Sequence, residues 1–205
     1  MTRQLLVKRM LDIIFAFVGM IALLIVFLVI GICIKFTSKG PVLFKQARLG
    51  KSGKVFNIYK FRTMVVGAEQ LGNGLFQDKD DDRITKVGHF LRITSLDELP
   101  QLFNILKGDM SFVGPRPPVT YYPCQFEEYS PDKKIRFQMP PGITGYAQVM
   151  GRNALSWDER IKYDVQYIEH FSLWLDMKII FLTIDKIIRQ ENVYGDDQKR
   201  SGKIS

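Results

Sequence analysis

The sequence is poor in the residues that build disulfide frameworks and metal clusters. Two cysteines, Cys33 and Cys124, and two histidines, His89 and His170, occur among 205 residues. The cysteines lie far apart in unlike surroundings, so the sequence has neither a disulfide framework nor a zinc-type spacing, and a reducing compartment is favoured. Neither histidine belongs to a motif that demands an imidazole, and both are interpreted as structural. Small disulfide-stapled domains and zinc modules are excluded.

Charge is absent from one long segment. The 22 residues from Ile13 to Ile34 include no charged residue, no proline, no serine and no threonine. As one α-helix this segment would extend about 33 Å, which is enough to cross a hydrocarbon core. A buried helix of a soluble protein is seldom this long and this apolar. A cleavable signal peptide is disfavoured because no small-residue cleavage site follows. The segment therefore predicts membrane attachment.

Basic residues flank the apolar segment on both sides. Arg3, Lys8 and Arg9 precede it, and Lys35 and Lys39 follow it. Basic flanks prefer the cytoplasm, and 22 residues are too short to cross twice. A re-entrant helix, which enters, bends and returns on one side, would satisfy both flanks, and a single crossing remains the alternative. The net charge of +8 also predicts an anionic partner: anionic lipid, a phosphorylated substrate or nucleic acid.

The stretch RITSLDELPQLFNILKGDMSFVGPRPP, from Arg92 to Pro118, carries the strongest chemical motif. Its adjacent carboxylates are predicted to open a helix, with Pro100 in the first turn, where backbone N–H groups have no intrahelical partner. Lys107-Gly108 predicts the end of this helix. Helical spacing predicts one buried face, formed by Leu99, Leu102, Phe103 and Leu106.

This pattern points to phosphate chemistry. A helix N-terminus attracts anions, and the carboxylates of Asp97 and Glu98 could hold Mg²⁺ or attack phosphorus. Arg92 upstream and Arg116, held between prolines, could neutralise phosphoryl oxygens. A purely structural interpretation stays open, because Ser95 and Glu98 stand three residues apart, as in a helix capping box.

Several long motifs in order make the chain resemble the bacterial sugar transferase family, the monotopic phosphoglycosyl transferases. Besides SLDELPQLFNILKGDMSFVGPRP, they are GPVLFKQARLG, FNIYKFRTM, DDRITKVGHFLR and PGITGYAQVMGRN, with Lys8-Arg9 and Asp12 before the apolar segment. The resemblance covers residues 8 to about 189, and the chain looks most like the small members. Those have a re-entrant helix broken by Ser-Pro; here Leu24-Ile25 stands in that place, and Gly19 and Gly31 are weaker candidates for flexure.

The resemblance implies transfer of a sugar 1-phosphate from a UDP-sugar to polyprenol phosphate, with release of UMP, at the cytoplasmic face of the bacterial inner membrane. This reaction begins the synthesis of a lipid-linked glycan. In this interpretation Asp97 is the nucleophile that carries the sugar phosphate, Glu98 helps to bind Mg²⁺, and Arg92 and Arg116 bind phosphate. UDP-sugar, polyprenol phosphate and anionic lipids are the expected partners, nucleic acid is not, and a homodimer is left open.

Further substrate-binding candidates come from the neighbouring motifs. Lys60 and Arg62 are expected near the nucleotide diphosphate, and Gln148 and Arg152 belong to a glycine-rich loop suited to line a pocket. The acidic run from Gln77 to Arg83 includes a D-x-D pattern, which in many glycosyltransferases holds a metal but here is interpreted as a solvated loop.

The predicted fold is a compact, mostly helical α/β domain docked on the membrane. Residues 1–40 are assigned to the hydrophobic helix, 41–190 to the catalytic domain and 191–205 to a polar tail. Short β segments are expected around the turn at 51–53, and a helix carrying Arg92 is expected from Lys86 to Thr94. Ser156 and Glu159 predict a capped helix; the one that follows, up to Arg189, is either core or interfacial.

Two rival functions are carried forward. The first is direct attack of the lipid phosphate in a ternary complex, in which both carboxylates only hold metal. The second is a non-enzymatic membrane scaffold that binds anionic lipid, against which the intact Asp97-Glu98 pair argues. Ping-pong kinetics would favour the covalent route over the ternary one.

Overall fold

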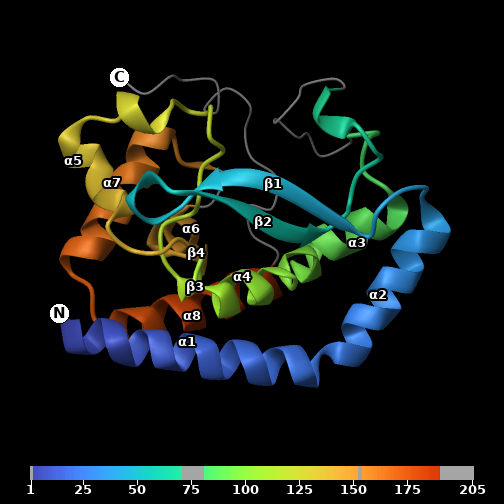
Figure 1. The fold of residues 1–205 in the computed structure, drawn as a ribbon, viewed down its shortest axis with the longest axis horizontal. Coiled ribbons are helices and arrows are strands. Elements are labelled where there is room, and N and C mark those ends of the chain that lie inside the picture. Colours follow the sequence, from blue (N-terminus) through green and yellow to red (C-terminus); the bar gives the residue numbers. More distant parts are fainter. Residues whose placement is uncertain (1, 71–80, 152–153, 190–205) are drawn as a thin grey trace.

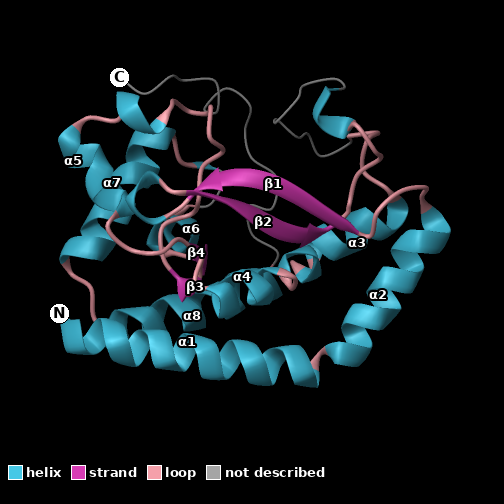
Figure 2. Cartoon of the chain, viewed as in Figure 1, coloured by secondary structure: helices cyan, strands magenta, loops and turns pink. Residues whose placement is uncertain are grey.

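The computed structural model describes residues 2–70, 81–151 and 154–189. Within these ranges the fold is mixed α/β and mostly helical, as predicted, with one N-terminal helix along the bottom and a second up the right side of a compact domain in Figures 1 and 2. Of the predicted features, the Asp78/Asp80 pattern, Arg152 and the tail at 191–205 lie outside the described residues.

The apolar segment forms two helices. Helix α1 spans Thr2–Ala22 and α2 spans Leu24–Thr37, and the chain is bent by 61° between them at Leu23. Neither helix alone meets the length and apolarity that a membrane span needs, whereas the bent pair does. A bend is therefore present without Ser-Pro, next to the expected position, while Gly19 and Gly31 lie inside the helices.

Packing explains the bend. On α1, Ala16 belongs to an apolar cluster shared with helix α4 (Gln101–Lys107) and strand β2 (Val55–Phe61), and Met20 and the bend residue Leu23 pack against it. On α2, Ile30 and Ile34 belong to a second cluster, shared with β2 and helix α3 (Lys86–Ile93). A straight helix could not reach both clusters, so tertiary packing takes the place of a local helix breaker.

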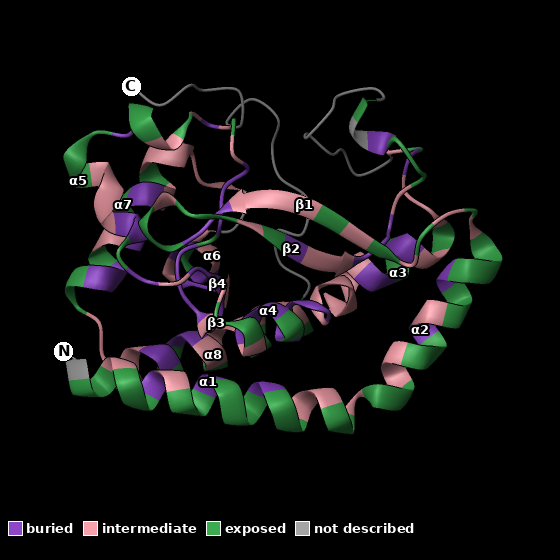
Figure 3. Ribbon diagram, viewed as in Figure 1, coloured by how far each residue is buried: buried purple, intermediate pink, exposed green. Residues whose placement is uncertain are grey.

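The outer faces of α1 and α2 are apolar and exposed (Figure 3). Phe36 is 87% exposed, Ile25 is 74% exposed and Met10 is 62% exposed. Many exposed apolar side chains on neighbouring turns of two helices are typical of a surface that contacts a membrane or a protein partner.

A β-hairpin crosses the middle of the domain. Strands β1 (Leu43–Leu49) and β2 (Val55–Phe61) pair antiparallel around a turn at Lys51–Gly53, which confirms the predicted β segments and turn and lengthens the strands. The register places Lys60 opposite Phe44, near the far end of the hairpin from the turn.

Helices α3 (Lys86–Ile93) and α4 (Gln101–Lys107) are joined by a short 3₁₀ turn at Leu96–Glu98. Helix α3 confirms the helix expected to carry Arg92, and Gly108 ends α4 in the left-handed conformation, as predicted. The buried face of α4 differs from the predicted one. Phe103 is 49% exposed, while the polar Asn104 is fully buried, because it binds the backbone of β2 at Tyr59 and Asn57.

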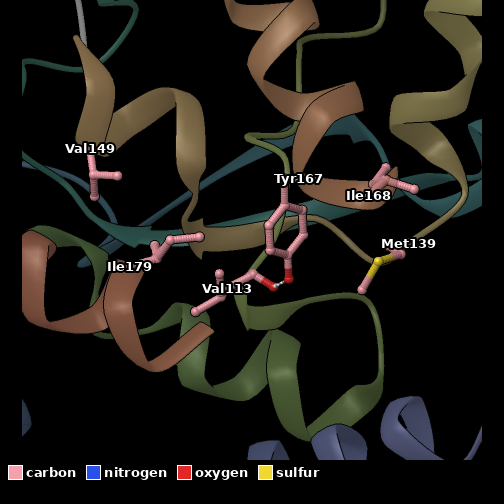
Figure 4. Close-up of a cluster of buried hydrophobic side chains, with 6 residues drawn as sticks. All are labelled: Val113, Met139, Val149, Tyr167, Ile168 and Ile179. Carbon is pink, nitrogen blue, oxygen red and sulfur yellow. Dashed lines mark hydrogen bonds between the residues drawn. The ribbon is translucent and has the colours of Figure 1, made fainter. Parts of the chain in front are cut away.

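The rest of the domain packs around a short parallel pair, β3 (Ser111–Val113) and β4 (Gly142–Thr144). The remaining helices are α5 (Pro131–Lys134), α6 (Tyr146–Met150), α7 (Trp157–Glu169) and α8 (Leu173–Ile188). Short 3₁₀ turns cover Ala68–Gln70, Phe126–Glu128 and Ile135–Phe137. One core cluster, drawn in Figure 4, comprises Val113, Met139, Val149, Tyr167, Ile168 and Ile179.

Helices α7 and α8 match their predictions closely. The capping box of Ser156 and Glu159 is present at the start of α7. The sequence predicts that helix α8 is either part of the core or at an interface, and the structure shows one buried face and one exposed face. Its Ile179 is fully buried in the core, while Trp174 is 79% and Phe181 65% exposed.

A buried polar cluster, here called the anchor cluster, ties α1 to the domain. Lys8 Nζ lies 2.6 Å from Asp176 Oδ2 on α8, and the hydroxyl of Tyr167 on α7 donates to Asp176 Oδ1 at 2.7 Å. Arg9, on the next position of α1, donates to the carbonyl of Ile105 near the C-terminal end of α4. The first turns of the apolar helix are thus fixed by polar contacts.

Candidate active site

The acidic pair lies in the 3₁₀ turn between α3 and α4. Ser95, just before it, has a left-handed backbone with φ = 58° and makes no side-chain capping bond. The capping-box interpretation of Ser95 and Glu98 is therefore wrong, because the Ser95 backbone is not in the extended conformation that an N-cap needs. A serine in this conformation costs about 1–2 kcal/mol, and such strain is typical of functional sites.

Two cations from distant segments hold Glu98. Lys60 Nζ on β2 lies 2.6 Å from Glu98 Oε1, and Arg116 Nη2 lies 3.5 Å from the same oxygen. Asp97 has a looser contact, with its Oδ2 4.0 Å from Lys60 Nζ. The side chains of Asp97 and Glu98 are only 13% and 18% exposed. These four residues are called the catalytic cluster below.

The surroundings separate the pKa values of the two carboxyl groups. Burial raises the pKa of Asp97; Lys60 opposes this rise and the charge of Glu98 adds to it. Burial acts on Glu98 in the same direction, but Lys60 and Arg116 outweigh it and lower the pKa of Glu98 to about 2. Neighbouring carboxyl groups with separated pKa values are suited to different roles. The lowered pKa keeps Glu98 ionised, and Asp97 is the more basic of the two carboxylates.

A cavity of about 450 Å³ lies beside this pair. Glu98, Arg92, Arg116 and Gln148 line it, so the structure brings three residues of the stretch from Arg92 to Pro118 together with Gln148 of the glycine-rich loop. The lining also includes Arg136, Arg160 and Lys186, which makes the cavity strongly cationic. Its size and charge suit a phosphorylated small molecule. Asp97 is not among the lining residues.

The other predicted residues have specific partners. Arg92 Nε donates to the hydroxyl of Thr63 at 2.9 Å, and Gln148 Nε2 donates to the carbonyl of Ile143 at 2.9 Å. Arg62 does not line the cavity: it is buried and its Nη2 donates to the carbonyl and the hydroxyl of Ser38, at the end of α2. These contacts connect the end of α2 to the end of β2, and the expected place of Arg62 near the nucleotide diphosphate stays a prediction.

Several lining residues were not predicted from the sequence. Arg136, Trp157 and Lys186 line the cavity but belong to none of the motifs from which site residues were predicted. Asp164 and Arg160, on α7, also line the cavity. The one available signal was arginine beside aromatic residues, since the guanidinium of Arg160 lies 5.2 Å from the centroid of the Trp157 ring.

A metal site at the pair would be incomplete without substrate. Among the described residues no group of three or more His, Cys, Asp or Glu side chains is placed to hold a metal ion. Mg²⁺ in enzymes is commonly bound by one or two carboxylates together with substrate phosphates and water. Asp97 and Glu98 fit that pattern as the two protein ligands.

Comparison with known proteins places the chain in a family. The family model for bacterial sugar transferases matches residues 3–190. The chain is 45% identical over 198 residues to a galactosyl transferase, CpsE of Streptococcus agalactiae, covering 90% of this chain and 43% of that protein. It is 44% identical over 192 residues to the UDP-glucose:undecaprenyl-phosphate glucose-1-phosphate transferase of Klebsiella pneumoniae, covering 91% of this chain and 41% of the relative.

A shorter relative is matched over most of its length. The chain is 46% identical over 153 residues to the sugar transferase EpsL of Bacillus subtilis, covering 75% of this chain and 73% of that protein. By contrast, the chain spans less than half the length of the first two relatives. The extent of the family match, together with the acidic pair beside a cationic cavity, shows that this chain belongs to the bacterial sugar transferase family.

Proposed function

We propose that this protein moves a sugar 1-phosphate from a UDP-sugar to polyprenol phosphate and releases UMP, as the first step of a lipid-linked glycan. The observation that carries this proposal is the catalytic cluster, in which two carboxylates of unlike pKa meet Lys60 and Arg116 beside a cationic cavity. The relatives' names add the substrate class, a UDP-sugar and undecaprenyl phosphate.

In the first step a carboxylate oxygen of Asp97 attacks the β-phosphorus of the UDP-sugar. A bond from Asp97 to phosphorus forms, the bond from the β-phosphorus to the bridging oxygen breaks, and UMP leaves with the electron pair. Arg116 and Lys60 are placed to neutralise the charge that accumulates on the phosphoryl oxygens. The raised pKa of Asp97 favours attack once the carboxyl group is ionised.

In the second step a phosphate oxygen of the polyprenol phosphate attacks the phosphorus held by Asp97. The new oxygen–phosphorus bond forms, the acyl phosphate bond breaks, and the carboxylate of Asp97 is restored. Glu98 lies next to Asp97 and remains ionised, so its charge can orient the incoming group. Splitting the transfer lets soluble UMP leave before the bulky lipid approaches.

We include Mg²⁺ as the expected cofactor. Bound by the acidic pair and substrate oxygens, it would neutralise phosphate charge and stabilise the leaving UMP. The protein residues supply the two carboxylates, while Lys60 already neutralises part of their charge. Chelation with EDTA should therefore abolish UMP release, and added Mg²⁺ should restore it.

The exposed apolar faces of α1 and α2 support attachment to the cytoplasmic face of the bacterial inner membrane. The bend at Leu23 and the basic residues on both flanks favour a re-entrant pair over a full crossing. Trp174 and Phe181 on α8 would add interfacial contacts with lipid. The site would then lie near the lipid-borne substrate.

The decisive experiment uses purified protein in detergent with a panel of UDP-sugars and no lipid acceptor. The covalent route predicts about one equivalent of UMP per active site, and an added sugar phosphate in the intact mass that hydroxylamine removes. Asp97→Asn should abolish both signals, since an amide cannot form the acyl phosphate. Asp109→Asn is the matched control, because Asp109 follows the same helix and pairs with Lys107 at 3.5 Å.

The ternary route remains the second candidate, and one observation favours it: Glu98 lines the cavity and Asp97 does not. That route predicts no UMP release without acceptor and no mass adduct. Near wild-type transfer by Asp97→Asn would establish it. A protein that releases no UMP from any UDP-sugar, with or without lipid phosphate, would instead be the non-enzymatic scaffold.

Membrane topology is tested separately. Cys33 and Cys124 are first replaced by serine, and single cysteines are then placed at Arg3 or Lys39, both exposed positions. A re-entrant pair predicts that an impermeant thiol reagent labels both positions from the same side. Labelling from opposite sides would establish a crossing, and quantitative release of the protein by high salt would refute insertion altogether.

A further inference from the structure

The turn that carries Arg116 is held by its carbonyl oxygens. Prolines at 115, 117 and 118 have no N–H group, so the turn cannot anchor itself there as a donor. Four consecutive carbonyls accept hydrogen bonds instead: Pro115 from Gly142 N, Arg116 from Arg136 Nη2, Pro117 from Arg48 Nη1 and Pro118 from Leu49 N. Two of the four donors are arginine side chains from elsewhere in the chain.

Arg136 makes the contact to the catalytic arginine itself. Its Nη2 donates both to the Arg116 carbonyl at 3.0 Å and to Asp164 Oδ2 at 2.7 Å, while Nε donates to the same carboxylate oxygen at 3.1 Å. The guanidinium therefore connects α7 to the turn through one rigid plane.

The surroundings of Arg136 fix that plane. Arg136 and Asp164 are each 2% exposed, and the guanidinium carbon lies 5.3 Å from the ring centroid of Phe137 and 5.8 Å from that of Trp157. A buried charge pair of this kind adds little to stability compared with apolar residues of the same size. Its contact with the turn that carries Arg116 is better explained by positioning.

We infer that Arg136, oriented by Asp164, is a positioning residue for Arg116, and that Arg48 is a second one acting at Pro117. Arg136 sets the place of the Arg116 backbone, and thereby the distance from the Arg116 guanidinium to Glu98 and to the transferring phosphoryl group. Lysine cannot replace it, because one ammonium group cannot reproduce the planar fork between a carboxylate and a carbonyl. This inference rests on the proposed function.

A double-mutant cycle tests it on the full chain in detergent, with UMP release from a UDP-sugar measured in a single turnover. As a single substitution, Arg136→Lys is expected to lower the rate of UMP release about tenfold. This loss should not exceed the loss caused by Arg116→Ala alone. In the Arg116→Ala background, Arg136→Lys should change the rate less than twofold, because the residue through which it acts is gone.

Arg83→Lys is the matched control. Arg83 is also buried and also donates to both a carboxylate, Asp81 at 2.7 Å, and a carbonyl, Ala68 at 2.8 Å, and neither of these two bonds is with the turn. If Arg83→Lys lowers the rate of UMP release, it should do so by the same factor in the wild type and in the Arg116→Ala variant. If Arg136→Lys fails to fold, Arg48→Lys at a half-buried position provides the same test, with the same loss of effect expected in Arg116→Ala.

Each outcome is informative. An equal loss from Arg136→Lys in both backgrounds would overturn the inference, since Arg136 would then act on substrate or on the fold directly. A wild-type rate in Arg136→Lys would overturn it as well. If the wild type itself releases no UMP, the proposed function fails; if it does and the two arginines are not coupled, only the positioning role fails.

Discussion

The anchor cluster and the catalytic cluster both pair buried carboxylates with cations, but they differ in how many of the carboxylate oxygens have a close partner. In the anchor cluster each carboxylate oxygen of Asp176 has a close partner, Lys8 at 2.6 Å and Tyr167 at 2.7 Å. In the catalytic cluster both cations meet one oxygen of Glu98, while Asp97 has its nearest cation at 4.0 Å. A cavity with further cations lies beside the second cluster.

This difference separates groups that hold the fold from groups available to a ligand. A fully paired buried ion has no capacity left to bind anything else, and its removal leaves a partner charge uncompensated. Burial raises the pKa of both Asp176 and Asp97, so the difference lies in the pairing: the nearest cation to Asp97 is 4.0 Å away, and this carboxylate retains the capacity to bind a ligand. Mutations in the anchor cluster should therefore change stability, and mutations in the catalytic cluster should change activity.

The largest stability effect is expected for Lys8→Met. Removing Lys8 leaves Asp176 buried without its cation, and breaking such a pair costs about 3–5 kcal/mol. Thermal unfolding in detergent should show a large loss of stability, while UMP release per folded molecule stays within about threefold of wild type. The comparison between clusters fails if Lys8→Met folds as stably as wild type.

Arg189→Met is the control for this change. Arg189 pairs with Asp185 at 2.8 Å, but its side chain is 63% exposed. Exposed pairs of this kind contribute about 0–1 kcal/mol. A large loss of stability from Arg189→Met would mean that removing a charge from any helix destabilises the protein. The effect of Lys8→Met could then not be assigned to the buried pair.

Unlike Lys8→Met, Arg116→Ala is expected to lower activity strongly and to leave the stability of the fold almost unchanged. A charge-assisted hydrogen bond to a phosphoryl oxygen contributes about 1.5–3 kcal/mol, or roughly a 10- to 150-fold loss in the rate of UMP release. Its side chain is 45% exposed, so unfolding should hardly change. Lys54→Ala, at an exposed turn, should leave the rate within about twofold. Equal small losses from both would remove Arg116 from the site.

Asp164 predicts a pH dependence of stability. Burial raises the pKa of Asp164 to about 6, against the opposing charge of Arg136. A carboxyl group with a raised pKa in the folded state contributes stability that is complete below the unfolded pKa, 3.8, and lost as pH rises through about 6. The unfolding free energy should fall by an amount of the order of 1–3 kcal/mol between pH 4 and pH 7.

Asp164→Asn isolates this contribution. Asparagine does not titrate, so the difference in pH dependence between wild type and variant belongs to residue 164. Equilibrium unfolding at pH 4, 5, 6 and 7 should show that the unfolding free energy of the variant minus that of the wild type increases with pH. A decrease of this difference with pH would mean that Arg136 keeps Asp164 ionised throughout, and the pair would then stabilise the fold at neutral pH.

Local sequence signals predicted the elements whose causes are local. The hairpin around Lys51–Gly53, the end of α4 at Gly108 and the capping box at Ser156 all follow from neighbouring residues, and the structure confirms them. The bend at Leu23 has no local cause, because it arises where two clusters formed by distant helices and β2 draw the chain in different directions. Sequence periodicity cannot contain that information.

The residues of the candidate site also fall into two groups, those that local motifs indicated and those that only tertiary packing brings together. The motifs indicated Glu98, Arg92, Arg116 and Gln148, which line one cavity. They also indicated Arg62, which is not among the residues that line this cavity and which donates to Ser38 at the end of α2. Arg136 and Asp164, 28 positions apart, could be paired only once α7 had packed against the segment that precedes β4. A charge that will be buried looks, in sequence, like one that will be solvated.

The smallest expected effect tests whether the acidic pair serves local structure. If Ser95 capped the turn, Ser95→Ala would cost about 1 kcal/mol. The structure predicts a change below about 0.5 kcal/mol, because Ser95 has a left-handed backbone and its side chain makes no capping bond. Ser156→Ala is the matched comparison, since the Ser156 hydroxyl accepts the Glu159 N–H in a true capping box. Chemical unfolding of both variants should therefore show a loss of about 1 kcal/mol for Ser156 alone. An equal loss from Ser95→Ala would restore a capping role for Glu98, and its position in the catalytic cluster would then need no chemical explanation.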